Sequence, residues 1–303
     1  EDGFARYLTA MFYEERGDWN EAVVAYRQAL RAYKRARKLY GIRPPPSLLP
    51  NALRAARRRG GSAERELEQR YGPARPRTIP EGHGEAVVLH YNGPAPLKAE
   101  TFFEVSFGAG WAYVSPMKRR QGRDSDGDAA FAAARSIAAH EIIRVAFPKY
   151  LPRPYVIRRM EIHAPGAEPA RSELVENVGA VAVRSLEDRR DVVWGRTIAR
   201  AAFKYAVSKG LCRKARREFD DLGALLTCAA LEAARIATER ADVRTWRTVP
   251  DQIGLASQAL PAGQHDLAIR FFDGRGGLVT ERTIPSVQVS PGERTFVMVR
   301  TIQ

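Results

Sequence analysis

The residue types that most often carry out enzymatic chemistry are thinly spread along this chain of 303 residues. Its five histidines are scattered, and segment 140–144 (HEIIR) lacks the second histidine of a zinc-protease helix. No serine stands in a Gly-x-Ser-x-Gly turn, and no glycine-rich segment leads into the Lys-Ser/Thr pair of a phosphate-binding loop. We therefore expect a protein that is not an enzyme and that uses no cofactor and no metal.

Two groups of acidic residues are the remaining candidates for chemistry. The segment Asp124–Asp128 (DSDGD) has the carboxylates and the glycine that suit calcium. Its order does not match an EF-hand, because Arg135 stands where the bidentate glutamate belongs, so we interpret it as a solvated acidic loop. Glu187 and Asp188 lie among arginines at helical spacing, which favours ion pairs along a helix over an acid–base pair.

Basic residues outnumber acidic ones, giving the chain a formal net charge of +14 at pH 7. The best candidate for an anion-binding patch is the arginine run Arg57, Arg58 and Arg59. Such a patch attracts phosphates and carboxylates, so the partner in this interpretation is an acidic polymer, either nucleic acid or acidic glycan. A solvated helix face is the alternative interpretation of the same residues.

The chain has two cysteines, Cys212 and Cys228, which flank a segment predicted to turn between two helices. A disulfide forms if the helical hairpin brings the two sulfurs together. Two free buried thiols are an equally good interpretation of the sequence. No apolar segment reaches the length of a membrane span, because Glu232 and Arg235 interrupt the best candidate.

The helices that must position any binding residues begin at the N-terminus. Small and aromatic residues alternate at helical intervals over 4–16 and 19–37, with Gly17 and Asp18 between them as a turn. This pattern resembles one tetratricopeptide repeat, and two shorter helices are expected over 48–58 and 63–71. A single repeat leaves an apolar face open. The interface residues that we predict on that face are Phe4, Tyr7, Met11 and Tyr26.

Beyond residue 80 the pattern changes to mixed strands and helices. Segment 85–107 alternates around Asn92-Gly93-Pro94, which predicts a β-hairpin. A long helical hairpin is expected over 172–240. Its first long helix has a small-residue face with Gly195, Ala199, Ala202 and Ala206, which allows close contact with another helix, and Gly210 is its expected end. Residues 250–303 predict four strands and three turns, which resemble a small antiparallel β-sandwich module.

The fold class expected from these patterns is α+β. Its first domain is a region of tetratricopeptide-like helical hairpins over residues 1–76. Its second is a mixed α+β domain over residues 80–303, which contains the helical hairpin 172–240 and the β module 250–303.

Several segments, taken in order, resemble a family of uncharacterised bacterial envelope lipoproteins. Among them are 4–30 (FARYLTAMFYEERGDWNEAVVAYRQAL), 81–100 (EGHGEAVVLHYNGPAPLKAE) and 241–256 (ADVRTWRTVPDQIGLA). The resemblance implies export to the periplasm, outer membrane or cell surface, together with a lipid-bearing cysteine and earlier repeats that would precede Glu1. It also implies an assembly role beside other envelope proteins, and it carries no active-site residues.

These observations lead to three hypotheses for function. The first is a non-catalytic structural or scaffold protein of the cell envelope that acts through protein–protein interaction. The second is a self-assembling subunit of an extracellular filament, in which copies stack head to tail through the open tetratricopeptide-like face. The third is a binder of an anionic polymer through the arginine-rich patches, which would show steep salt dependence.

Overall fold

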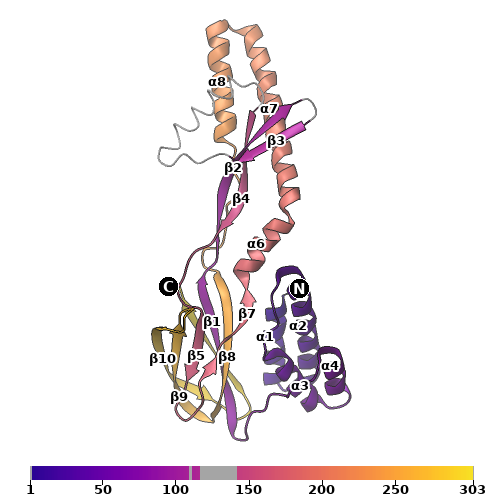
Figure 1. Cartoon of the computed structure of the whole chain (residues 1–303), viewed down its shortest axis with the longest axis vertical. Coiled ribbons are helices and arrows are strands. Elements are labelled where there is room, and N and C mark those ends of the chain that lie inside the picture. The colour runs from indigo at the N-terminus through magenta and orange to yellow at the C-terminus, as the bar shows by residue number, and fades with distance from the viewer. Residues whose placement is uncertain (1, 109–110, 117–141, 303) are drawn as a thin grey trace. The chain divides into compact units, whose positions relative to one another are not determined.

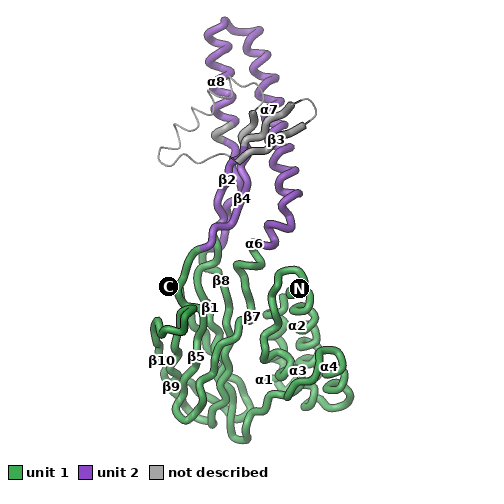
Figure 2. The backbone as a smooth tube through the Cα atoms, in the orientation of Figure 1, with its two compact units in different colours: residues 1–96, 153–182, 247–303 green, residues 97–152, 183–246 purple. Residues whose placement is uncertain are grey.

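The computed structural model describes residues 2–108, 111–116 and 142–302. As expected from the sequence, the protein is mixed α+β, with 43% of residues in helices and 31% in strands. The chain forms two compact units, which Figure 2 shows in different colours. Unit 1 comprises residues 1–96, 153–182 and 247–303, and unit 2 comprises residues 97–152 and 183–246.

Unit 1 begins with four helices (Figure 1): α1 (Gly3–Glu15), α2 (Trp19–Tyr40), α3 (Leu48–Arg59) and α4 (Ala63–Tyr71). Polar caps fix where the first two begin. The Asp2 carboxylate accepts a hydrogen bond from the Ala5 amide, and the Asp18 carboxylate accepts one from the Glu21 amide. Gly41 ends α2 in the left-handed conformation, with φ of 71°, which glycine adopts without steric cost.

Two four-stranded sheets complete unit 1. We call the first sheet A. Its strands, in spatial order, are β11 (Arg294–Thr301), β1 (His83–Pro94), β8 (Pro250–Pro261) and β7 (Glu173–Asn177). The strands of the second sheet, sheet C, are β10 (Leu278–Val289), β9 (Gly263–Phe272), β5 (Arg159–His163) and β6 (Ala170–Arg171). β11 runs parallel to β1, whereas all the other paired strands of both sheets are antiparallel.

The central strand β1 is buried on both of its faces. Val87 and Leu89 belong to a core shared with the four helices, while Ala86 and Val88 belong to a core shared with sheet C. Every residue from Gly84 to His90 is buried. Because side chains alternate along a strand, this pattern places the helices and sheet C on opposite faces of sheet A.

Unit 2 combines a three-stranded sheet with two long helices. The elements are β2 (Leu97–Gly108), β3 (Trp111–Pro116), β4 (Ile142–Leu151), α7 (Arg190–Glu218) and α8 (Asp221–Ala237). Val145 and Phe147 of β4 pack against Ala201 of α7, and the ring of Trp194 stacks on Phe147 with centroids 4.3 Å apart. A further helix, α6 (Val178–Asp188), contains the boundary between the two units. No described helix is long and apolar enough to cross a membrane.

Several sequence predictions of organisation are wrong. Strands β1 and β2 do not form the predicted hairpin 85–107, because β1 pairs with β8 and β11 whereas β2 pairs with β3 and β4. The helices over 1–76 are not a separate domain, since they share a core with sheet A. The four strands predicted over 250–303 are present, but they do not form a module by themselves, because β8 and β11 both pair with β1. The helix expected to end at Gly210 continues to Glu218.

Candidate functional site

The four predicted interface residues lie inside unit 1. Phe4 is 8% exposed, and Tyr7, Met11 and Tyr26 are fully buried. They belong to the core between the helices and sheet A. The Tyr7 hydroxyl also shares a hydrogen bond of 2.6 Å with Ser47 Oγ and accepts one of 2.7 Å from Asn51 Nδ2. The predicted open face is therefore wrong, because strands distant in the sequence cover it.

The predicted anion patch is exposed at the end of α3. Arg57 forms an ion pair of 2.6 Å with Glu64, and Arg59 Nε donates a hydrogen bond of 3.0 Å to Asn20 Oδ1. Two of the three arginines thus have partners within the chain. Anion binding at Arg57, Arg58 and Arg59 stays a prediction. The acidic segment Asp124–Asp128 lies outside the described residues.

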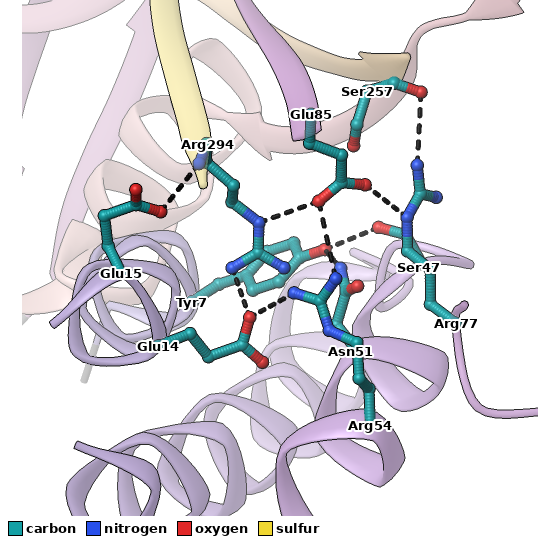
Figure 3. A network of polar contacts seen from close by, with 10 residues as sticks. All are labelled: Tyr7, Glu14, Glu15, Ser47, Asn51, Arg54, Arg77, Glu85, Ser257 and Arg294. Atoms are coloured by element: carbon teal, nitrogen blue, oxygen red, sulfur yellow. Dashed lines mark hydrogen bonds and ion pairs between the residues drawn. The ribbon is translucent and has the colours of Figure 1, made fainter. Parts of the chain in front are cut away.

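A buried network of charged side chains joins the helices to sheet A (Figure 3). At its centre, Arg294 of β11 forms ion pairs with Glu14 of α1 and, at 2.8 Å, with Glu85 of β1. These three side chains are only 1–3% exposed. The amide of Arg294 donates a further hydrogen bond of 2.8 Å to Glu15. The network therefore ties residues of three different elements together in the interior of unit 1.

Two further arginines complete the buried network. Arg54 of α3 forms ion pairs with Glu14 and, at 3.6 Å, with Glu85. Arg77 forms an ion pair with Glu85 and donates a hydrogen bond of 3.3 Å to the Ser257 carbonyl. Each carboxylate thus faces at least two guanidinium groups, which is the compensation that a buried charge requires.

Burial dominates the electrostatics of this network. Desolvation raises the pKa of Glu14 to about 7, although the charge of Arg294 opposes the shift. Burial also raises the pKa of Glu85, against the effect of Arg77, and it raises the pKa of Tyr7 above its ordinary value. Because the central side chains are closed to solvent, we assign the network a structural role in holding the helices on sheet A.

The exposed candidate site is the hairpin formed by α7 and α8 in unit 2. The disulfide Cys212–Cys228 joins the two helices, with the Cα atoms 5.1 Å apart. This geometry decides between the two interpretations of the cysteines in favour of the bond. Ala201 and the neighbouring aromatic Trp194 lie on the side of α7 that packs within unit 2. The predicted small-residue face of α7 is turned away from that packing, and Gly195, Ala199 and Ala206 are exposed.

Large apolar side chains are also exposed on the hairpin. Phe203 is 71% exposed, Leu222 is 63% exposed and Leu226 is 62% exposed. The other large apolar residues exposed on the hairpin are Val192, Val207, Leu211, Phe219 and Leu225. A single exposed leucine is ordinary, but eight such residues on one pair of helices make an apolar surface of the kind used for binding.

Along most of α7, the charge beside this apolar surface has one sign. From Val192 to Arg217, α7 contains no aspartate and no glutamate. Arg200 and Lys204 both form ion pairs with Glu239, at 2.8 and 3.2 Å. Other cations of the helix are exposed, among them Arg196, Arg213, Lys214 and Arg217. Along α7 the surface is therefore both apolar and basic.

Within residues 2–108, 111–116 and 142–302, no group of three His, Cys, Asp or Glu side chains could hold a metal ion. Comparisons with protein-family models, curated proteins and solved structures found no match. The sequence signalled the small-residue face of α7. It did not predict the buried network, because the residues next to Arg294 in the sequence do not distinguish it from the many exposed arginines.

Proposed function

We propose that the protein is a non-catalytic scaffold of the bacterial cell envelope that binds partner proteins through the α7–α8 hairpin. The observation that carries this proposal is the set of eight large apolar residues exposed on the two helices. Covering a side chain such as Phe203 is worth roughly 1.5–3 kcal/mol. The exposure of these side chains in the free protein is therefore explained if a partner protein covers them when it binds.

The disulfide Cys212–Cys228 supports an exported location. Disulfides persist in the periplasm and at the cell surface, whereas cytosolic proteins mostly keep their thiols reduced. A bond that links α7 to α8 also keeps the apolar surface in one arrangement. Pre-ordered helices lose less conformational freedom when a partner binds, which increases the affinity.

The other hypotheses receive less support from the arrangement of the chain. The filament hypothesis depended on an open face at Tyr7 and Tyr26, and both side chains are fully buried. The anionic-polymer hypothesis depended on Arg57, Arg58 and Arg59, of which Arg57 and Arg59 have partners within the chain. Helices α1 and α2 pack closely through small residues and tyrosines. This packing supports the interpretation of these two helices as one tetratricopeptide-like repeat.

Photocrosslinking in the cells that produce the protein tests the proposal. A photoreactive amino acid is placed at Phe203 or Leu222 of the hairpin, or at Met298 of unit 1, which is 69% exposed. We expect one adduct of discrete mass from both hairpin positions and none from position 298. A diffuse pattern that is the same at all three positions would show that the hairpin is not a docking element.

A further inference from the structure

We infer that the occupant of the hairpin is an acidic α-helix of the partner protein, which lies along the outer face of α7. This inference rests on the proposed function and specifies its partner. The outer face comprises seven exposed residues: Val192, Gly195, Ala199, Phe203, Ala206, Val207 and Gly210. At about 100° per residue, these positions fall within roughly one third of the helix circumference. They therefore form one stripe about 27 Å long, interrupted by the exposed Arg196, and its length suits a helix of the partner.

The two glycines of the outer face are not required by the protein's own packing. Among the residues that the structure describes, none lies within 4 Å of a Cβ atom added at Gly195 or Gly210. Neither glycine has the positive φ that excludes other residues. Glycine inside a helix nevertheless destabilises it by about 0.5–1 kcal/mol relative to alanine. A partner helix that packs against these positions would explain the glycines. The distance between packed helices depends on the side chains at the contact, and glycine lets the two backbones approach closely.

The charges along the outer face select the partner's chemistry. Arg196 lies within the arc of the outer face, between Phe203 and Val207, and Arg213 and Lys214 fall within the same arc just beyond Gly210. With no carboxylate on α7 between Val192 and Arg217, the face is complementary to a helix whose flanks carry glutamate or aspartate. Charged residues that flank an apolar helix seam set partner choice in the same way in coiled coils.

Two other occupants fit the outer face less well. An anionic bilayer gains from large apolar side chains, and Gly195 and Gly210 offer it none. The apex of the hairpin also carries Glu218, Asp220 and Asp221, which an anionic surface repels. A second copy of α7 would place like charges opposite one another, which costs several kcal/mol.

The first experiment selects the partner chemistry directly. The full-length protein is presented with a displayed library of helical peptides of about 20 residues, long enough to cover the outer face. One side of each peptide is apolar, and the flanking positions are randomised between glutamate and lysine. We expect strong enrichment of glutamate among the bound peptides. Enrichment of lysine, or no enrichment, would overturn the inference.

The second experiment uses substitutions that keep the fold. The double variant Gly195→Leu/Gly210→Leu adds side chains into open space and improves helix propensity. Fluorescence anisotropy should show that it binds the selected acidic peptide at least about tenfold more weakly, a change of roughly 1.4 kcal/mol. Ala233→Leu, on an exposed position of α8, adds the same bulk elsewhere and should leave the affinity unchanged.

The same variants separate the alternatives. If a bilayer is the occupant, the added leucines should strengthen binding to phosphatidylglycerol vesicles, which is the opposite sign. If a second copy is the occupant, the unliganded protein should dimerise in sedimentation and the leucines should abolish the dimer. Either result overturns the inference. An unchanged peptide affinity together with a discrete adduct at Phe203 would overturn the acidic-helix inference and leave the proposed docking function in place.

Discussion

Phe271 and Phe203 are the same residue in opposite settings. Phe271 of β9 is fully buried between the sheets of unit 1, and Phe203 of α7 is 71% exposed in unit 2. The arginines show the same contrast, because Arg294 is enclosed by carboxylates whereas Arg213 is exposed. In the interior of unit 1, Phe271 packs against other apolar side chains, and Arg294 pairs with carboxylates. Unit 2 leaves part of its apolar and charged groups at the surface, where a partner can use them.

The glycines of the two units repeat this difference. A Cβ atom at Gly84 in β1 would lie 2.1 Å from the Ser290 carbonyl oxygen, so no larger residue fits there. At Gly210 in α7 the same atom would meet nothing. The chain therefore contains two kinds of glycine. Packing within the protein requires Gly84, whereas no contact among the described residues requires Gly210. The second kind is the one that points to an external contact.

The largest expected effect comes from the two phenylalanines. Phe271→Ala should lower the free energy of unfolding by about 3–5 kcal/mol, because it leaves a cavity between the sheets. Phe203→Ala, its matched control, should change that free energy by less than about 0.5 kcal/mol. Urea unfolding followed by circular dichroism measures both. Equal losses would mean that Phe203 packs within the chain in solution.

A loss of similar size is expected from Arg294→Met. The substitution removes the central partner of Glu14 and Glu85 and leaves their buried charges less compensated, at an expected cost of about 3–5 kcal/mol. Arg300→Met, on an exposed position of the same strand, should be nearly neutral. Chemical denaturation of both variants makes the comparison. If Arg294→Met left the free energy of unfolding unchanged, Arg54 and Arg77 would be sufficient to compensate the charges of Glu14 and Glu85.

A local effect is expected from breaking the disulfide. Cys212→Ser/Cys228→Ser opens a loop closed over a separation of 16 residues, and the entropic model gives about 3 kcal/mol for a loop of this length. Hydrogen exchange should accelerate in α7 and α8 but not in sheets A and C. Faster exchange throughout both units would show that the hairpin contributes to the stability of the whole chain.

The pH dependence of stability should report on Glu14. Its pKa is raised by burial from 4.5 to about 7 in the folded chain. The folded state therefore holds the proton more tightly, so the contribution of Glu14 is full below about pH 4.5 and is lost as the pH rises through about 7. Unfolding measured between pH 5 and 8, relative to Glu14→Gln, isolates this contribution. A difference between the two proteins that is the same at every pH would contradict it.

The smallest expected effect is a gain. Gly210→Ala should raise the free energy of unfolding of the isolated protein by about 0.5–1 kcal/mol, because alanine is the better helix former and the site has space. Thermal unfolding of the variant measures the gain. A destabilised variant would mean that the protein itself requires glycine at this position.

The local features of the fold could be predicted from the sequence. Helices α1 and α2 follow from their periodicity and from the turn at Gly17 and Asp18. The long helical hairpin follows in the same way, but the helical prediction from residue 172 is wrong at its start, because Glu173–Asn177 form strand β7. The small-residue face of α7 was also predicted. These features depend on residues three or four positions apart, which a sequence displays directly.

The features that were missed depend on residues far apart in the sequence. The pairing of β11 with β1 and the contact between Arg294 and Glu85 join positions separated by 209 residues. Tyr7 and Tyr26 had the pattern of an open face because the strands that cover them come later in the chain. The sequence analysis made no prediction for Phe203, which is 71% exposed on α7.

The parallel pairing of β1 with β11 has a consequence for synthesis of the chain. After Glu85, a ribosome must add 209 residues, of which Arg294 is the last, before the carboxylate meets its guanidinium partner. Until then sheet A lacks its parallel edge strand, and the apolar sides of α1 and α2 remain without part of their cover. Contacts of such long range make folding slow and expose nascent chains to aggregation. A chain interrupted before Arg294 would lack the arginine that pairs with Glu14 and Glu85, so it could not form the centre of the buried network.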